Sequence, residues 1–161
     1  MIGYILLVAA AIAMSAIVYV WLKSYVPKDV ASCPDGVSVY VKELGCDNGV
    51  LNFTLKNNGR FSIDGYNIYA TESAVQEVAV LDLIQYQQNS ISGEDLTIFS
   101  SREGGTLNVG EESYYQVFDI PPSTKIFLIE ITPTRTEKYN NKDIKVFCSN
   151  AKIREVIECQ G

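Results

Sequence analysis

The first 22 residues of the chain, MIGYILLVAAAIAMSAIVYVWL, contain no charged side chain, and Lys23 follows them directly. As a helix with a rise of about 1.5 Å per residue, such a segment just crosses a bilayer core of about 30 Å. Everything after it has the pattern of a water-soluble β domain that carries four cysteines. The chain therefore combines one apolar helix with one exported domain, which excludes a cytosolic metabolic enzyme.

The middle of the helix is built from small residues. Residues 9–16 read AAAIAMSA, and larger apolar residues flank them on both sides. Small side chains let helix backbones approach closely in an apolar medium, where packing drives association. We expect helix-to-helix contacts to use the following small and bulky positions: Ile5, Ala9, Ala10, Ile12, Ala13, Ala16 and Ile17.

The composition after the helix limits the possible chemistry. About 135 residues remain, which is enough for one domain. The net charge is −6, so phosphate backbones are repelled and nucleic-acid binding is not expected. The chain has no histidine, which removes the commonest metal ligand and the commonest general base. We expect no metal site, no cofactor and no enzymatic activity.

Two acidic pairs are the remaining candidates for catalysis. Glu94-Asp95 and Glu111-Glu112 could serve glycoside hydrolysis only if two acids faced each other across a cleft. No nucleophile motif of a serine or cysteine hydrolase accompanies them. We therefore interpret both pairs as solvated turn charges.

The four cysteines predict two disulfide bonds, which persist in an oxidising compartment. Residues 36–43 and 152–157 are expected to be extended, so each would hold its flanking cysteines beyond the Cα limit of about 7 Å for a bridge. Each N-terminal cysteine should thus pair with a C-terminal one. Which of the two cross-pairings forms depends on whether the terminal strands run parallel, and both stay open for Cys33, Cys46, Cys148 and Cys159.

Two features of the sequence disagree about the orientation of the helix in a membrane. Lys23 and Lys28 follow the helix, and the positive-inside rule would then put the β domain in the cytoplasm. The paired cysteines favour export instead. A short basic leader preceding Met1 would reconcile the two.

Alternating apolar residues predict an antiparallel β-sandwich of eight or nine short strands. We expect turns at residues 47–49 and 140–141, and a hairpin at Asn57-Asn58-Gly59, because Asn and Gly tolerate the positive φ of tight turns. Residues 74–85 fit a strand or a short helix, and we favour the strand. The predicted strands cover residues 37–42, 51–56, 60–70, 95–100, 113–119, 125–132, 144–148 and 152–158.

Surface candidates on this domain are a sequon and a group of tyrosines. Asn52-Phe53-Thr54 is an N-x-[ST] sequon, and the phase of its strand points Asn52 outward, so we expect N-glycosylation there. Four of the ten tyrosines are candidates for an adhesive surface, with packing on the sheet as the favoured interpretation. They are Tyr86, Tyr114, Tyr115 and Tyr139.

Two stretches resemble a known family. The opening MIGYILLVAAAIAMSAIVYVWLKSYVP resembles the N-terminal helix of archaeal type IV pilin-like proteins, the superfamily that includes archaellins. LNFTLKNNGRFSIDGYNIYA, from Leu51 to Ala70, resembles the first hairpin of their immunoglobulin-like head. Ile5 is apolar where bacterial type IV pilins carry a glutamate, which fits the archaeal branch. The basic leader that a prepilin peptidase removes in this family is not part of the sequence given.

The resemblance implies a helical homopolymer with helices bundled in its core and β heads displayed outside for adhesion or cell–cell contact. It also implies insertion in the membrane before assembly, and processing by a prepilin peptidase and the pilus machinery. We expect residues 1–26 to form the helix, 27–32 a linker and 33–161 the extracellular head. The alternative is a membrane-anchored β-sandwich that does not polymerise, like the archaellum stator subunits that bind the surface layer.

Overall fold

The computed structural model describes residues 2–25, 32–88, 97–98 and 105–161. The chain divides into a helical unit that ends at Val30 and a β unit, here called the head, that begins at Ala31. This division falls inside the expected linker at 27–32. Each unit is described by itself.

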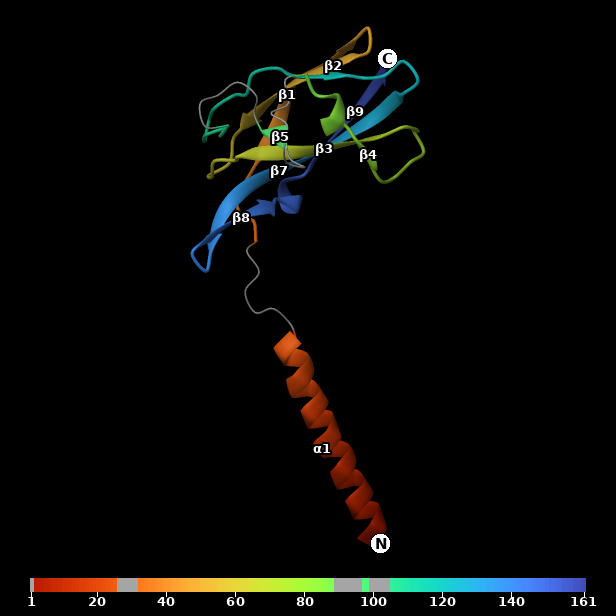
Figure 1. The fold of residues 1–161 in the computed structure, drawn as a ribbon, viewed down its shortest axis with the longest axis vertical. Coiled ribbons are helices and arrows are strands. Elements are labelled where there is room, and N and C mark those ends of the chain that lie inside the picture. The colour runs from red at the N-terminus through yellow and green to blue at the C-terminus, as the bar shows by residue number, and fades with distance from the viewer. Residues whose placement is uncertain (1, 26–31, 89–96, 99–104) are drawn as a thin grey trace. The chain divides into compact units, whose positions relative to one another are not determined.

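The helical unit consists of α1, Ile2–Tyr25 (Figure 1). Apolar residues with good helix propensity fill it, and Lys23 lies in its last turn, where a cation complements the helix dipole. The segment Gly3–Tyr25 is long and apolar enough to cross a membrane, a property that signal sequences share. Every side chain from Gly3 to Tyr25 is exposed in the single chain.

Three strands form the smaller sheet of the head. β1 (Val39–Asp47) and β2 (Val50–Asn57) make an antiparallel hairpin, and β6 (Gln116–Asp119) pairs with the other edge of β2. The hairpin turns at Asn48 (φ 50°) and Gly49 (φ 79°), as expected from the Asp-Asn-Gly sequence.

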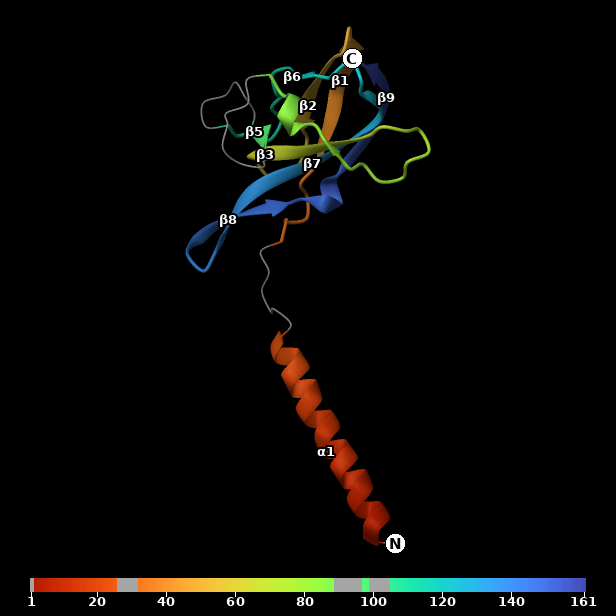
Figure 2. The same ribbon diagram turned by 45° about the vertical axis from the view of Figure 1, so that its right-hand side comes forward.

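Six strands form the larger sheet, in which β3 and β7 are the central pair. The first part of β7 pairs with β9 and its last part with β8, through a turn at Asn140-Asn141 with positive φ at both residues. The β7–β8 ribbon extends beyond the rest of the sheet (Figure 2). The strands are β3 (Gly65–Thr71), β4 (Leu81–Asp82), β5 (Thr97–Ile98), β7 (Lys125–Tyr139), β8 (Lys142–Phe147) and β9 (Ile153–Gln160).

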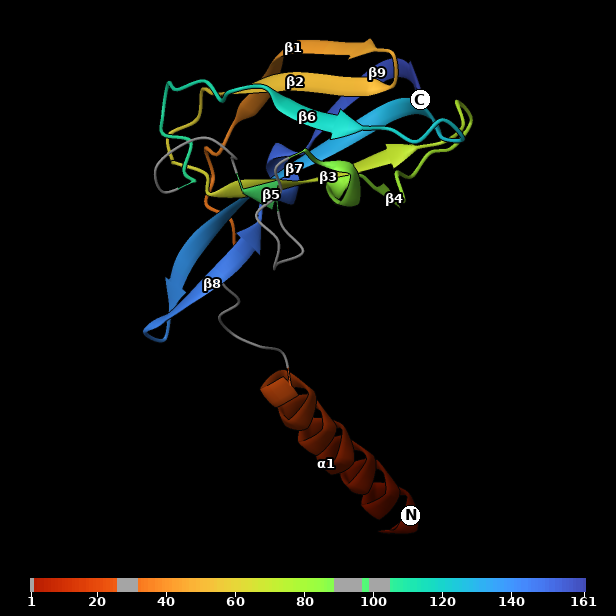
Figure 3. The ribbon, with the colours of Figure 1, turned by 45° about the horizontal axis from the view of Figure 1, so that its top comes forward.

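One hydrophobic core lies between the two sheets, which form separate layers in Figure 3. Phe53 stacks on Phe118 at 5.6 Å between ring centroids and meets the edge of Tyr66 from the larger sheet at 5.8 Å. The Tyr66 hydroxyl donates to Gln116 Oε1 at 2.9 Å, so a fully buried polar group is satisfied across the core. Leu51, Phe53 and Leu55 of β2 alternate into the core as the sequence pattern predicts. In β7 a register shift between Ile126 and Leu128 breaks the alternation, so Ile126, Ile129 and Ile131 face the core.

The disulfide prediction is confirmed. Cys33 pairs with Cys148 and Cys46 with Cys159, at Cα–Cα distances of 5.1 and 5.5 Å. In this cross-pairing the first cysteine of the N-terminal segment joins the first cysteine of the C-terminal segment, and the second joins the second. No free cysteine occurs among the described residues.

The predicted hairpin at Asn57-Asn58-Gly59 is wrong. None of the three residues has positive φ, and the chain crosses from the smaller sheet to the larger one instead of turning back. The buried Asn57 amide donates to Phe61 O and Leu107 O at 2.9 and 3.0 Å and accepts from Gly59 N–H. These bonds direct the chain away from β2, so the stretch Leu51–Ala70 is a sheet-to-sheet crossover rather than a hairpin.

The preferred strand at 74–85 is also wrong over most of its length. Only β4 is extended there, and η1, a 3₁₀ turn over Ile84–Tyr86, follows it. A second 3₁₀ turn, η2, covers Ser149–Ala151. The strands predicted at 113–119, 125–132, 144–148 and 152–158 correspond to β6, β7, β8 and β9 with shifted ends, and part of 95–100 lies outside the described residues.

Gly59→Ala tests the crossover. A Cβ at Gly59 would lie 2.5 Å from Ser38 N and 2.7 Å from Gly36 O, and backbone atoms cannot rotate away. We expect a loss of about 1–3 kcal/mol in the free energy of unfolding, measured by denaturant titration of the full chain in detergent. Asn58→Ala, at the exposed neighbouring position, should stay within about 0.5 kcal/mol of the wild type. Equal stability of all three proteins would contradict the close approach.

Candidate functional site

Helix α1 is the largest apolar surface among the described residues. Ile5, Leu7, Met14 and Ile17 each expose about two thirds or more of their side chains. Soluble monomers rarely leave a continuous apolar surface of this kind in water. The helix must therefore be covered by lipid, by other helices or by both.

The two serine hydroxyls of α1 are satisfied within the helix. Ser15 Oγ donates to Ala11 O at 2.9 Å, and Ser24 Oγ donates to Trp21 O at 2.7 Å. An unsatisfied polar group would be costly in hydrocarbon, so these internal bonds suit an apolar surrounding. Together with the absence of charge before Lys23, they leave no polar face on the helix.

Small and bulky side chains occupy distinct positions around α1. Ala9, Ala13 and Ala16 follow a spacing of four and three residues and share one face. All seven positions named for helix contacts are exposed in the single chain, so nothing in the monomer competes for them. The structure holds one chain, and their role in assembly stays a prediction.

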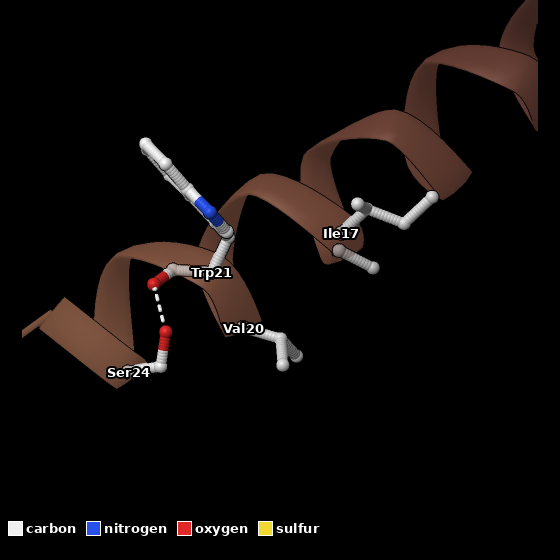
Figure 4. A pocket seen from close by; sticks show the side chains of 5 residues that line it. Ile17, Val20, Trp21 and Ser24 are labelled. Atoms are coloured by element: carbon white, nitrogen blue, oxygen red, sulfur yellow. Dashed lines mark hydrogen bonds between the residues drawn. The ribbon is translucent and has the colours of Figure 1, made fainter.

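A shallow groove of about 530 Å³ runs along the C-terminal part of α1. Figure 4 shows Ile17 and Val20 on one side of it and Trp21 directed away from them. The groove is a gap between neighbouring side chains on an uncovered helix rather than an enclosed cavity. The ring of Trp21 lies 4.8 Å from that of Tyr25, in the aromatic collar typical of a membrane interface.

The sequon lies in the middle of the smaller sheet. Asn52 is half-buried on the outer face of β2, beside Gly45, whose missing side chain leaves room for the Asn52 amide. Thr54 is only 4% exposed, and its hydroxyl has no hydrogen-bond partner among the described residues. Near it, the hydroxyl of Tyr115, the residue before β6, donates to Glu43 of β1. Glycosylation of Asn52 stays a prediction.

The four tyrosines have different surroundings. Tyr114 and Tyr115 are 59% and 56% exposed, which excludes packing in the core, while the Tyr115 hydroxyl reaches Glu43 of β1 on the outer face of the smaller sheet. Tyr86 is half-buried against the core, and Tyr139 is half-buried in the β7–β8 ribbon. The structure does not bring the four together into one patch.

The acidic pairs do not form a two-carboxylate cleft in the described part of the chain. Glu112 pairs with Lys42 at 2.7 Å, and Glu111 Oε2 accepts from Asn108 N at 2.9 Å. Glu94-Asp95 lies outside the described residues. Within the described ranges, no three His, Cys, Asp or Glu side chains gather in a way that could hold a metal ion.

An ion cluster of one buried acid and two exposed cations on the larger sheet was missed at the level of sequence. Glu130 is only 8% exposed, and its two oxygens receive Lys152 Nζ at 2.6 Å and Arg154 Nε at 2.9 Å. Burial alone would raise the pKa of Glu130, but the hydrogen bonds from both cations outweigh it and lower the pKa below its usual 4.5. In the sequence, the sign of this cluster is the single acidic residue Glu130 within the otherwise apolar residues 126–131.

No protein-family model matches the chain, and neither the curated proteins nor the solved structures contain a match. The function therefore has to be argued from the surface of α1 and the chemistry of the head.

Glu130→Gln tests the ion cluster. A carboxylate with a lowered folded-state pKa stabilises the head above its unfolded-state pKa, and this contribution is lost as the pH falls through the folded-state pKa. We expect the variant to unfold at a lower temperature than the wild type at neutral pH. The difference should shrink as the pH falls below 4.5, the usual value for this carboxyl.

Thermal unfolding of the full chain at several pH values measures this effect. Glu112→Gln, which breaks the exposed pair with Lys42, is the matched control and should shift the neutral-pH midpoint little. If the unfolding midpoints of the wild type and Glu130→Gln differ by the same amount at every pH, the charge of the carboxylate does not cause the difference in stability.

Proposed function

We propose that this protein is a structural subunit of an extracellular filament of the archaeal type IV pilus class. One observation carries the proposal: α1 is apolar and exposed on every side, while the head buries a complete core of its own. A helix of this kind suits a lipid phase first and a bundle of identical helices afterwards. The head is then left free for display outside the filament core.

The central alanines favour a bundle over a simple anchor. A single membrane anchor needs only apolar length, and leucine would serve it as well as alanine. The small residues at 9–16 gain less free energy on transfer from water to lipid than leucine would, but they allow the backbones of neighbouring helices to approach closely. The partners proposed here are identical subunits, with a prepilin peptidase and the assembly machinery supplied by the family resemblance.

The two disulfides support an oxidising, extracellular location for the head. We also assign the head to the immunoglobulin-like class, on the basis of two antiparallel sheets around one core. In antibody domains a disulfide joins the two sheets beneath a tryptophan, whereas here Trp21 is the single tryptophan and lies in α1. The assignment therefore refers to the layered architecture.

Ala10→Leu and Ala13→Leu test the close-packed core. Each adds bulk to an interface that relies on small side chains, and overpacking costs about 1–3 kcal/mol per contact, repeated at every subunit. We expect both variants to enter the membrane normally but to give no filaments, as judged by electron microscopy of sheared cell-surface material. A non-polymerising anchor would tolerate both changes.

Met14→Leu is the matched control, because it keeps volume and apolar character in the same part of α1 at a position outside the predicted contact set. Filaments should persist in this variant. If cells carrying Ala10→Leu or Ala13→Leu still shed filaments of normal diameter that contain the protein, the filament-core role of these alanines is refuted.

A further inference from the structure

The outer face of the larger sheet carries a polar pocket of about 280 Å³. Its floor is made of two neighbouring cross-strand pairs of β3 and β7, Asn67 with Thr132 and Tyr69 with Glu130. These two strands run side by side in Figure 2. Its walls come from the β3–β4 connection, the end of β8 and the η2 turn: Ala79, Phe147, Ser149 and Lys152.

The amide of Asn67 is the most informative group in this pocket. Asn67 is only 9% exposed, and its Oδ1 atom is enclosed without a hydrogen-bond partner among the described residues. A buried polar group without a partner costs free energy, and natural proteins rarely keep one without a reason. Because Oδ1 is shielded from solvent, a ligand reaches it only if the amide turns toward the pocket that Asn67 lines.

The charges at the pocket are already matched. Glu130 uses one oxygen for Lys152 and the other for Arg154, and Arg154 also donates to Glu77 O at 2.6 Å. A phosphate or sulfate would need cations that are not committed to a carboxylate. The pocket therefore favours a neutral ligand that has many hydroxyl groups.

An aromatic side chain borders the polar floor. Phe147 is 50% exposed at the end of β8, next to the buried and disulfide-bonded Cys148, which anchors its backbone. An exposed phenyl ring offers a flat apolar surface beside donors and acceptors. The C–H faces of a sugar ring are apolar and its edge carries hydroxyls, which matches this combination.

We propose that this pocket binds one neutral pyranose unit of a glycan. The Asn67 amide and the hydroxyls of Thr132 and Ser149 meet the sugar hydroxyls, and Phe147 lies against a C–H face. The volume is below the range of about 300–1,000 Å³ usual for drug-sized ligands, which suits a single ring. A sugar site would give the proposed adhesive function its ligand. It depends on the proposed function only for the display of the head outside the cell.

Saturation-transfer NMR on the full chain tests the proposal. The chain is kept in amine oxide micelles, since a glycosidic detergent would compete for the site. The probes are methyl glycosides of glucose, galactose, mannose and N-acetylglucosamine. We expect transfer to the ring protons of at least one probe, with millimolar affinity, because the pocket is shallow and open.

Asn67→Ala and Phe147→Ala should each weaken binding of that probe about tenfold, the loss expected for one hydrogen bond or one apolar contact. Phe147 is half-exposed, so its variant should fold even if Asn67→Ala does not. The matched controls are Asn58→Ala and Val156→Ala, which remove an exposed amide and an exposed apolar side chain outside the pocket. Both should bind as the wild type does.

Three results would overturn the proposal: no transfer to any probe, binding that Phe147→Ala leaves unchanged, or binding of glucuronate and sulfate but of no neutral glycoside. The measurement uses dispersed chains, so such a failure leaves the filament assay untouched. Conversely, filaments that persist in Ala10→Leu or Ala13→Leu would refute the filament proposal, and the test of sugar binding by the head would still stand.

Discussion

The head depends on the covalent closure of its chain ends. Cys33–Cys148 and Cys46–Cys159 join positions 115 and 113 residues apart, and β2 to β8 all lie between the joined segments. In the chain-entropy description, closing a loop of about 100 residues removes unfolded-state entropy worth about 4–5 kcal/mol. The second bridge adds less, because the first already holds the two segments near each other. Bridges of this kind suit an oxidising compartment, where they persist.

The same bridges also control the edges of the two sheets. β1 and β9 are edge strands of different sheets, and Cys46 and Cys159 near their ends link one to the other. Edge strands with free backbone groups invite pairing with other chains. The Cys46–Cys159 bridge joins two of these edges at one side of the core. The pocket around Asn67 and Glu130 lies on the outer face of the larger sheet.

The helix and the head require different surroundings. α1 exposes apolar side chains all round, whereas the head buries Leu51, Phe53 and Ile131 completely and keeps its ions in matched pairs. Insertion in a membrane or packing against other helices would cover α1. Neither requires the head to unfold or rearrange. The helix and the head can therefore each meet a different solvent.

The sequence by itself determined the apolar helix, the antiparallel β head and the cross-pairing of terminal cysteines, because periodicity, charge and chain reach are local properties. It failed at Asn57-Asn58-Gly59, since hydrogen bonds from Asn57 to Phe61 and to the distant Leu107 override the local turn preference. It also missed the pocket, whose floor requires the register of β3 with β7 and whose wall requires η2 beside Glu130. Only the tertiary structure decided these features, because each depends on residues that are far apart in the chain and adjacent in the folded head.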